Sequence, residues 1–241
     1  MKLSETWYSE RLRQDVQVVR WGEVGTPVLL FPTAGGDAEE VERFLMMDAL
    51  AHLLAAKRIK VYSCDSVAGR AWVAREGTDA HRARLQNQFH EFVYRELVPA
   101  IRMDCRDSDL EVIAAGASIG AYNALAVQCR YPDAFKAAIC MSGTYDLQRF
   151  IDRERTADYY DASPLHFLRD LEGPQLERLR SRYVLLASGE GRAEDITESW
   201  RVAHLLGLKG IPNRVDPWGA EWHHDWPTWR RMLPQYLDEF A

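Results

Sequence analysis

One serine between two glycines constrains this chain more than any other feature of its sequence. Residues 116–120 read Gly-Ala-Ser-Ile-Gly and directly follow an apolar run, Leu110–Ala115. The apolar run predicts a buried strand, and the run from Ala121 to Arg130 predicts a helix. A strand that passes into a helix through Gly-x-Ser-x-Gly predicts a sharp turn with the serine at its tip. In such a turn the positions two residues before and two residues after the serine pack so closely that only glycine fits.

The predicted turn gives Ser118 the position of a nucleophile. Its hydroxyl would project from the sheet at the start of a helix, where the helix dipole favours negative charge. A serine hydroxyl is a weak nucleophile at neutral pH and needs a base to take its proton. The alternative is a glycine-rich turn with an inert serine, so the question becomes whether the chain offers a base.

Seven histidines are present, and five of them lie where packing is their ordinary role. These five, in predicted helices or in the charged segment 146–182, are His52, His81, His90, His166 and His204. The remaining pair, His223 and His224, follows the last predicted strand, Asn213–Trp218. The base of a Ser–acid–His enzyme comes from that loop, so one of the pair is the predicted base. No HExxH pattern accompanies them, so we predict no metal site.

The supporting acid is expected in a loop at the same end of the sheet as the base. The loop after the predicted strand Tyr183–Ala187 offers Glu190, Glu194 and Asp195, and Asp146 is an alternative outside it. From their positions alone, any of these four carboxylates could be the supporting acid.

Donors for a negatively charged oxygen are predicted on two loops. The backbone N–H of Ile119, the residue after the serine, supplies one. The loop after the predicted strand Pro27–Phe31 reads Pro-Thr-Ala-Gly-Gly at residues 32–36. Proline has no N–H and two glycines allow a close approach of the backbone, so Ala34 is the predicted second donor. A plain tight turn is the alternative.

Composition excludes several other classes of protein. The 241 residues are 47% hydrophobic, which is enough for a sizeable core, and carry a net charge of −6. That charge argues against nucleic acid or an anionic membrane as a partner. No run is long enough to span a membrane, and the first 20 residues lack the apolar run of a signal peptide. Four scattered cysteines predict neither a disulfide framework nor a zinc site. We therefore expect a cytoplasmic protein without metal or cofactor.

Alternating strands and helices predict one α/β domain over residues 1–241, with a mostly parallel sheet and helices on both faces. The runs Val16–Trp21 and Pro27–Phe31 are predicted to form a hairpin through Gly22–Gly25. The segment 146–182 is charged, contains two prolines and is long for a connection. We expect it to form a lid or cap.

The chain resembles the esterase D-like putative esterase family of α/β-hydrolases, which includes feruloyl esterases and mycolyltransferases. The matching segments, in order, are LLFPTAGG (29–36), GASIGAYNA (116–124), YPDAF (131–135), MSGTYD (141–146) and HDWPTW (224–229). This resemblance implies an α/β-hydrolase fold, with a mostly parallel central sheet and helices on both faces.

The resemblance also bears on the site. The family's base is the histidine of the His-Asp-Trp element, which selects His224 over His223. A Gly-x-Gly-x-x-Glu pattern, found in similar members and matched here from Gly189 to Glu194, ranks Glu194 first among the acids and Asp195 second. The family's first oxyanion loop often reads His-Gly-x-Gly-Gly, whereas Pro and Thr replace His-Gly here.

Together these features predict a serine carboxylic-ester hydrolase that acts on a small-molecule ester through an acyl-enzyme on Ser118. An acyltransferase, a peptidase and a non-catalytic binding protein of the same fold are the alternatives. Asp65 and Ser66, which follow the predicted strand Arg58–Cys64, are possible substrate contacts. Trp226 is another, although it would serve equally in the core. The oligomeric state is not predicted.

Overall fold

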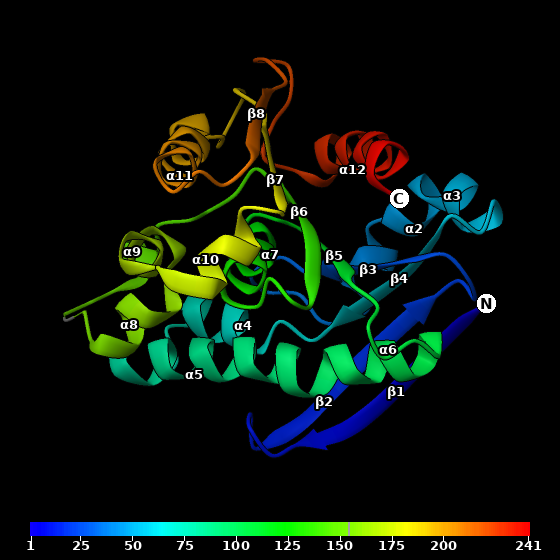
Figure 1. Ribbon diagram of the computed structural model, residues 1–241, viewed down its shortest axis with the longest axis horizontal. Coiled ribbons are helices and arrows are strands. Elements are labelled where there is room, and N and C mark those ends of the chain that lie inside the picture. The colour runs from blue at the N-terminus through cyan, green and yellow to red at the C-terminus, as the bar shows by residue number, and fades with distance from the viewer. Residues whose placement is uncertain (154) are drawn as a thin grey trace.

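A computed structural model describes residues 1–153 and 155–241. Within them the chain forms one eight-stranded sheet in the order β1-β2-β4-β3-β5-β6-β7-β8, flanked by helices (Figure 1). The strands are β1 (Lys2–Ser9), β2 (Gln14–Trp21), β3 (Thr26–Phe31), β4 (Ile59–Cys64), β5 (Val112–Ala117), β6 (Phe135–Met141), β7 (Tyr183–Ser188) and β8 (Asn213–Pro217).

The sheet is parallel from β4 to β8 and antiparallel only where β2 meets β1 and β4. Every residue of β4 and β5 is buried, as expected for central strands covered on both faces. The predicted mostly parallel α/β architecture is confirmed. The carboxyl ends of β3 to β8 therefore meet at one edge of the sheet, which is where ligands bind in open α/β sheets.

The predicted hairpin of Val16–Trp21 and Pro27–Phe31 is wrong. Strand β2 pairs with β1 and β4, while β3 lies beyond β4 and runs parallel to it. The glycines of the connection are needed for a crossing rather than a hairpin turn. A Cβ on Gly25 would lie 2.5 Å from the backbone nitrogen of Ile59, at the start of β4. Strand β1 escaped prediction because nearly all its side chains are exposed.

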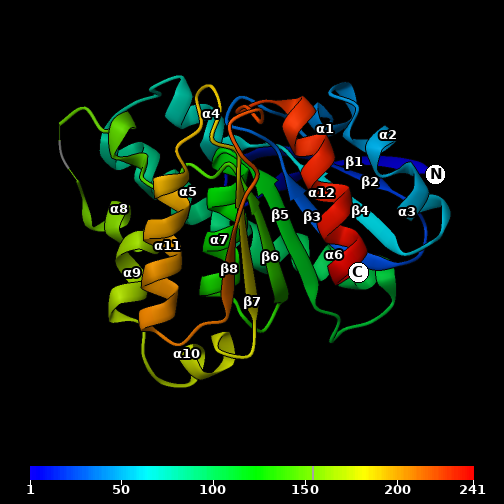
Figure 2. The ribbon, with the colours of Figure 1, turned by 90° about the horizontal axis from the view of Figure 1, so that it is seen from above.

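Helices cover the two faces of the sheet unequally. They are α1 (Glu40–Arg43), α2 (Met46–Ala49), α3 (Ala51–Ala55), α4 (Val67–Val73), α5 (Asp79–Phe92), the π-helical turn η1 (Val93–Leu97), α6 (Val98–Cys105), α7 (Ile119–Arg130), the 3₁₀ turn η2 (Leu147–Phe150), α8 (Ala157–Ala162), α9 (Pro164–Asp170), α10 (Gly173–Leu179), α11 (Ile196–Leu208) and α12 (Trp226–Phe240). One face packs against α1–α3 and α12, and the other packs against α4–α7 and α9–α11. Figure 2 shows α12 and α1–α3 together on one side of the sheet, away from α8, α9 and α11. No helix among the described residues has the length and hydropathy needed to span a membrane.

The segment 146–182 contains η2, α8, α9 and α10. Its second half buries Leu168 and Leu179 in the main core, where α9 and α10 contact α7. The hydroxyl of Tyr122 on α7 donates a hydrogen bond of 2.8 Å to the carbonyl of Ala162 at the end of α8. These helices thus belong to the layer that covers the sheet. The assignment of residues 146–182 as a lid or cap and the single-domain organisation stay predictions, and Glu154 lies outside the described residues.

Candidate active site

Ser118 stands alone between a strand and a helix. Strand β5 ends at Ala117 and α7 begins at Ile119, and Ser118 adopts φ 57° and ψ −121°. A non-glycine residue in this region costs on the order of 1–3 kcal/mol and persists only where its surroundings hold it. Here the Ser118 N–H donates to the carbonyl of Met141 (3.0 Å), and the Ser118 carbonyl accepts from the N–H of Thr144 (3.2 Å). The end of β6 thus fixes the strained turn.

The two glycines of the motif are required by close backbone approaches. A Cβ on Gly116 would lie 2.3 Å from the carbonyl carbon of Gly120. A Cβ on Gly120 would lie 2.7 Å from the carbonyl oxygens of both Phe31 and Pro32. The helix start therefore packs against the loop after β3. These contacts leave no room for a side chain at either glycine of Gly-x-Ser-x-Gly.

The predicted base, His224, lies in the loop just before α12. Its N–H donates to the carbonyl of Arg192 (3.1 Å), and its Nδ1 lies 3.4 Å from Oε2 of Glu194. The next residue, Asp225, caps α12 by accepting from the N–H (3.3 Å) and hydroxyl (3.0 Å) of Thr228. The aspartate of the His-Asp-Trp element thus caps a helix. The carboxylate that lies beside the His224 ring is that of Glu194.

Glu194 has the environment expected of a supporting acid. Its side chain is only 1% exposed, whereas that of His224 is 23% exposed. The Ser142 hydroxyl donates to Oε1 (2.5 Å), and the Ser188 hydroxyl lies 3.4 Å from Oε2. A buried carboxylate with these partners is held in one orientation, with Oε2 toward the imidazole.

The other three candidate acids form no hydrogen bond with His224 among the described residues. Asp195 caps α11 by accepting from the N–H of Thr197 (3.1 Å). Asp146 caps η2 through the N–H of Gln148 (2.9 Å), and Glu190 is exposed. In the described part of the chain, Glu194 is the only one of the four that contacts His224.

The other histidines have structural surroundings. Nδ1 of His223 accepts the N–H of Arg192 (2.9 Å), which orients the loop beside His224. His90 is fully buried on α5, where burial lowers its pKa to about 3, and its Nε2 lies 2.8 Å from the Gln86 amide nitrogen. Burial also lowers the pKa of His166. Residues 1–153 and 155–241 contain no group of three or more His, Cys, Asp or Glu placed to hold a metal ion.

Ser118 and His224 both follow strands whose carboxyl ends lie at the same edge of the sheet. Ser118 follows β5 and His224 follows β8, and β6 and β7 lie between these two strands. No hydrogen bond joins the two side chains among the described residues, and Nε2 of His224 has no partner there. Catalytic hydrogen bonds of unliganded enzymes are often long and shorten when substrate binds.

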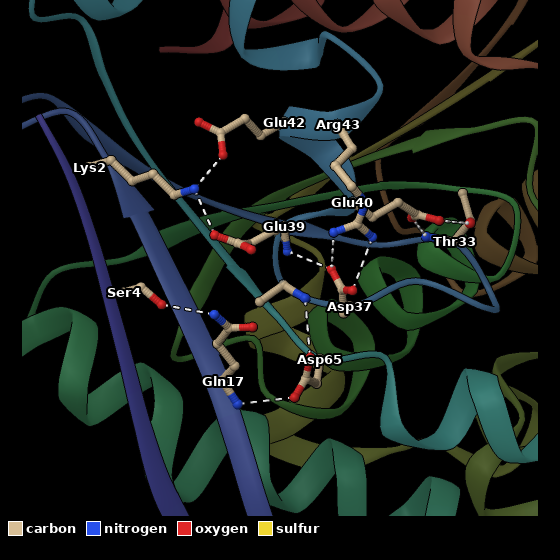
Figure 3. A network of polar contacts seen from close by, with 11 residues as sticks. Lys2, Ser4, Gln17, Thr33, Asp37, Glu39, Glu40, Glu42, Arg43 and Asp65 are labelled. Carbon is tan, nitrogen blue, oxygen red and sulfur yellow. Dashed lines mark hydrogen bonds and ion pairs between the residues drawn. The ribbon is translucent and has the colours of Figure 1, made fainter.

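The two predicted oxyanion donors have free amides. Neither the N–H of Ala34 nor that of Ile119 donates a hydrogen bond within the described residues. The neighbouring Thr33 is locked: its N–H and its hydroxyl each donate to Glu40 at 2.7 Å. Figure 3 shows the Glu40 side chain reaching from α1 to Thr33. Glu40 is buried, and burial raises the pKa of its carboxyl.

Asp65 fastens the other end of this loop. Its Oδ1 accepts from the N–H of Ala38 (3.2 Å), and its Oδ2 accepts from the N–H of Gln17 on β2 (3.0 Å), as Figure 3 shows for Gln17. Ser66 is buried, and Trp226 stacks on Phe44 with ring centroids 4.9 Å apart. The structure thus gives Asp65 and Trp226 internal partners. Substrate contact by Asp65, Ser66 or Trp226 stays a prediction.

Sequence reasoning missed two residues at this site, Ser142 and Glu40. Ser142 lies in the segment 141–146 that carries part of the family resemblance, but its partner Glu194 is 52 residues away. Glu40 follows Thr33 by seven residues and lies at the start of α1. The sequence shows this short spacing but not that the glutamate is buried.

Comparison with known proteins decides the family. A family model described as "Putative esterase" matches residues 60–240, well over half of the chain. The chain belongs to the putative esterase family. The match covers Ser118, Glu194 and His224 and begins after the loop that contains Ala34. A search of curated protein sequences finds no match for this esterase.

Solved structures show that this esterase has the α/β-hydrolase fold. A ferulic acid esterase superposes with a TM-score of 0.75 at 16% identity, over 100% of this chain and 99% of the other. An S-formylglutathione hydrolase from Agrobacterium tumefaciens gives 0.70 at 13% identity, over 100% and 92%. The fluorophosphonate-binding serine hydrolase F of Staphylococcus aureus gives 0.71 at 13% identity, over 99% and 97%. The predicted fold and family are confirmed, and the chain is an esterase by family.

Proposed function

We propose that this esterase hydrolyses small-molecule carboxylic esters through an acyl-enzyme on Ser118, with His224 as base and Glu194 as supporting acid. One observation carries the proposal. The buried Glu194 carboxylate lies 3.4 Å from Nδ1 of His224, at the sheet edge where Ser118 occupies its strained turn. A carboxylate in this position fixes the imidazole tautomer that leaves Nε2 as a base.

The reaction follows from these roles in two stages. His224 Nε2 takes the Ser118 proton as the hydroxyl oxygen attacks the ester carbonyl carbon. The N–H groups of Ile119 and Ala34 stabilise the resulting oxyanion. The tetrahedral intermediate collapses to the acyl-enzyme, and His224 gives its proton to the departing alcohol. Water then attacks the acyl-enzyme in the same way and releases the acid and free Ser118.

A panel of p-nitrophenyl esters of increasing acyl length, together with aryl esters, tests the activity. We expect saturable release of p-nitrophenol, and mass spectrometry of the quenched enzyme should find the acyl group on the peptide that contains Ser118. Transfer to an added alcohol in preference to water would reassign the protein as an acyltransferase. A protein that neither turns over esters nor reacts with a fluorophosphonate would be a binding protein.

Neutralising the acid should separate Glu194 from its neighbour Asp195. Glu194→Gln keeps the size of the side chain but offers an amide to His224, so the wrong tautomer is favoured. We expect turnover to fall by about four orders of magnitude, the size of the effect in serine proteases. Asp195→Asn is the matched control, because asparagine also caps helices. It should keep turnover near the parent value.

Thermal melts would show whether both variants are folded. If Asp195→Asn collapsed in rate while Glu194→Gln stayed near full activity, the acid would be Asp195. Loss in neither variant would move the assignment to Glu190 or Asp146.

Loosening the oxyanion loop should slow the reaction without removing any reacting group. Glu40→Ala deletes the acceptor for both hydrogen bonds of Thr33 and leaves a half-buried N–H unpaired, which costs up to about 1–3 kcal/mol of stability. Loss of a single oxyanion donor costs about 10²–10³-fold in kcat, so a displaced Ala34 N–H should cost up to that amount. Kinetics and thermal melts check both effects.

Glu40→Gln is the control, because its amide oxygen can still accept the Thr33 N–H and its NH₂ can donate to the Thr33 hydroxyl. It should retain most of the rate. Equal kcat in the parent, Glu40→Ala and Glu40→Gln would mean that the Thr33 lock does not position the donor.

A further inference from the structure

We propose that Ser142 and Trp229 are positioning residues that hold the Glu194–His224 pair in its reactive geometry. The proposal rests on the triad proposed above. It adds two residues that act through Glu194 and His224 and form no bond in the reaction themselves. Their side chains, together with those of the pair, form a closed ring of contacts.

The backbone of Ser142 is the first sign of a specific role. Ser142 directly follows β6 and is 3% exposed, yet it has φ 47°, a conformation that favours glycine. A buried serine held in this conformation is strained, and glycine would occupy it without strain. Such strain points to a use for the hydroxyl that glycine could not replace.

Hydrogen bonding defines that use. The indole Nε1–H of Trp229 lies 2.9 Å from the Ser142 hydroxyl oxygen. Because the indole group can only donate, the hydroxyl oxygen must accept this bond. The hydroxyl proton is then left for Oε1 of Glu194, 2.5 Å away. Trp229 thus sets the direction in which Ser142 donates, and Ser142 in turn holds one oxygen of the carboxylate.

The same tryptophan also packs against the base. The Trp229 ring meets the His224 ring edge to face, with centroids 5.2 Å apart and planes at 85°. Trp229 is 4% exposed and lies in the first turns of α12, four residues after Asp225. Trp229 therefore restrains His224 directly through its ring, and it restrains Glu194 indirectly through its hydrogen bond to Ser142. These contacts join helix α12, the end of β6 and the loop after β7.

Single and double substitutions test the ring. Ser142→Ala removes the hydroxyl, and Trp229→Phe keeps an aromatic ring but removes the N–H. A hydrogen bond to a charged group is worth roughly a 10- to 100-fold effect, so Ser142→Ala should lower kcat by about that factor. The KM should stay within about twofold, because both residues are proposed to act on the Glu194–His224 pair and not on the substrate. Trp229→Phe should cost less, and the double variant no more than Ser142→Ala alone, because both act through the same hydroxyl.

A spectroscopic signature separates positioning from packing. The Nδ1 proton of His224, held against a carboxylate, should give a downfield proton resonance in the parent enzyme. It should move or broaden in Ser142→Ala. Ser63→Ala is the matched control: Ser63 is a buried serine on β4 whose hydroxyl has no hydrogen-bond partner among the described residues. This variant should keep both the parent kcat and the parent resonance.

If Ser142→Ala is too unstable to measure, Ser142→Gly removes the hydroxyl and relieves the backbone strain. Parent kcat in folded Ser142→Ala or Ser142→Gly, or additive losses in the double variant, would overturn the proposal. Failure of the triad itself would look different, because Glu194→Gln and His224→Ala would then also retain activity.

Discussion

Ser118→Ala abolishes ester hydrolysis and labelling by a fluorophosphonate: this is the largest effect that we expect. In the proposed mechanism the hydroxyl forms the bond to the acyl group, so its removal leaves the reaction without a nucleophile. Loss of the nucleophile in a serine hydrolase lowers kcat by about a millionfold. The alanine variant should fold, because Ala keeps the Cβ that Ser118 already carries in its strained turn at φ 57°.

The measurement is stoichiometric labelling followed by peptide mapping, with turnover of a p-nitrophenyl ester in parallel. The parent should incorporate one fluorophosphonate per chain on the peptide that contains Ser118. Ser63→Ala should label like the parent. Labelling that persists in Ser118→Ala would assign the nucleophile to another residue and remove the basis of the mechanism.

The second large effect is expected at His224, with its neighbour as an internal comparison. His224→Ala removes the proton acceptor, and turnover should fall by several orders of magnitude because the members of a triad act as a unit. His223→Asn replaces the ring nitrogen that accepts the Arg192 N–H with an amide oxygen that can also accept it. Turnover of this variant should stay within about tenfold of the parent.

The two substitutions are one residue apart, so the comparison shows directly which of the two histidines is the base. If His223→Asn lost most of the activity and His224→Ala kept it, the base would be His223. Fluorophosphonate reactivity should follow the same ranking, because it too depends on activation of Ser118.

Local patterns were sufficient to predict much of the fold and part of the site. The Gly-x-Ser-x-Gly turn, with its apolar strand and following helix, is a contiguous signal. The close backbone contacts at Gly116 and Gly120 explain why the motif needs both glycines. The pairing of β2 and β3 was predicted wrongly because β4, which separates them, comes some thirty residues later in the chain. Turn residues report where a strand ends but carry no information about which strand lies beside it.

The partners of the site residues were harder to predict for the same reason. Glu194 could be ranked first only through the family pattern, because four carboxylates fitted the loop geometry. Ser142 and Trp229 lie 87 residues apart and meet only after β6 and α12 have packed. A serine that donates to a buried acid has no local signature.

The position of His224 next to a helix cap links catalysis to the stability of the last helix. Asp225 caps the first turn of α12, and helix ends are where helices fray, so the proposed base is attached to such an end. The nucleophile, by contrast, is attached to β5 at the centre of the sheet, where all strand residues are buried. Partial unfolding begins in the regions with the least protection. Mild heating should therefore detach the proposed base from an intact sheet, and the enzyme would lose its catalytic power as a local event that reverses on cooling.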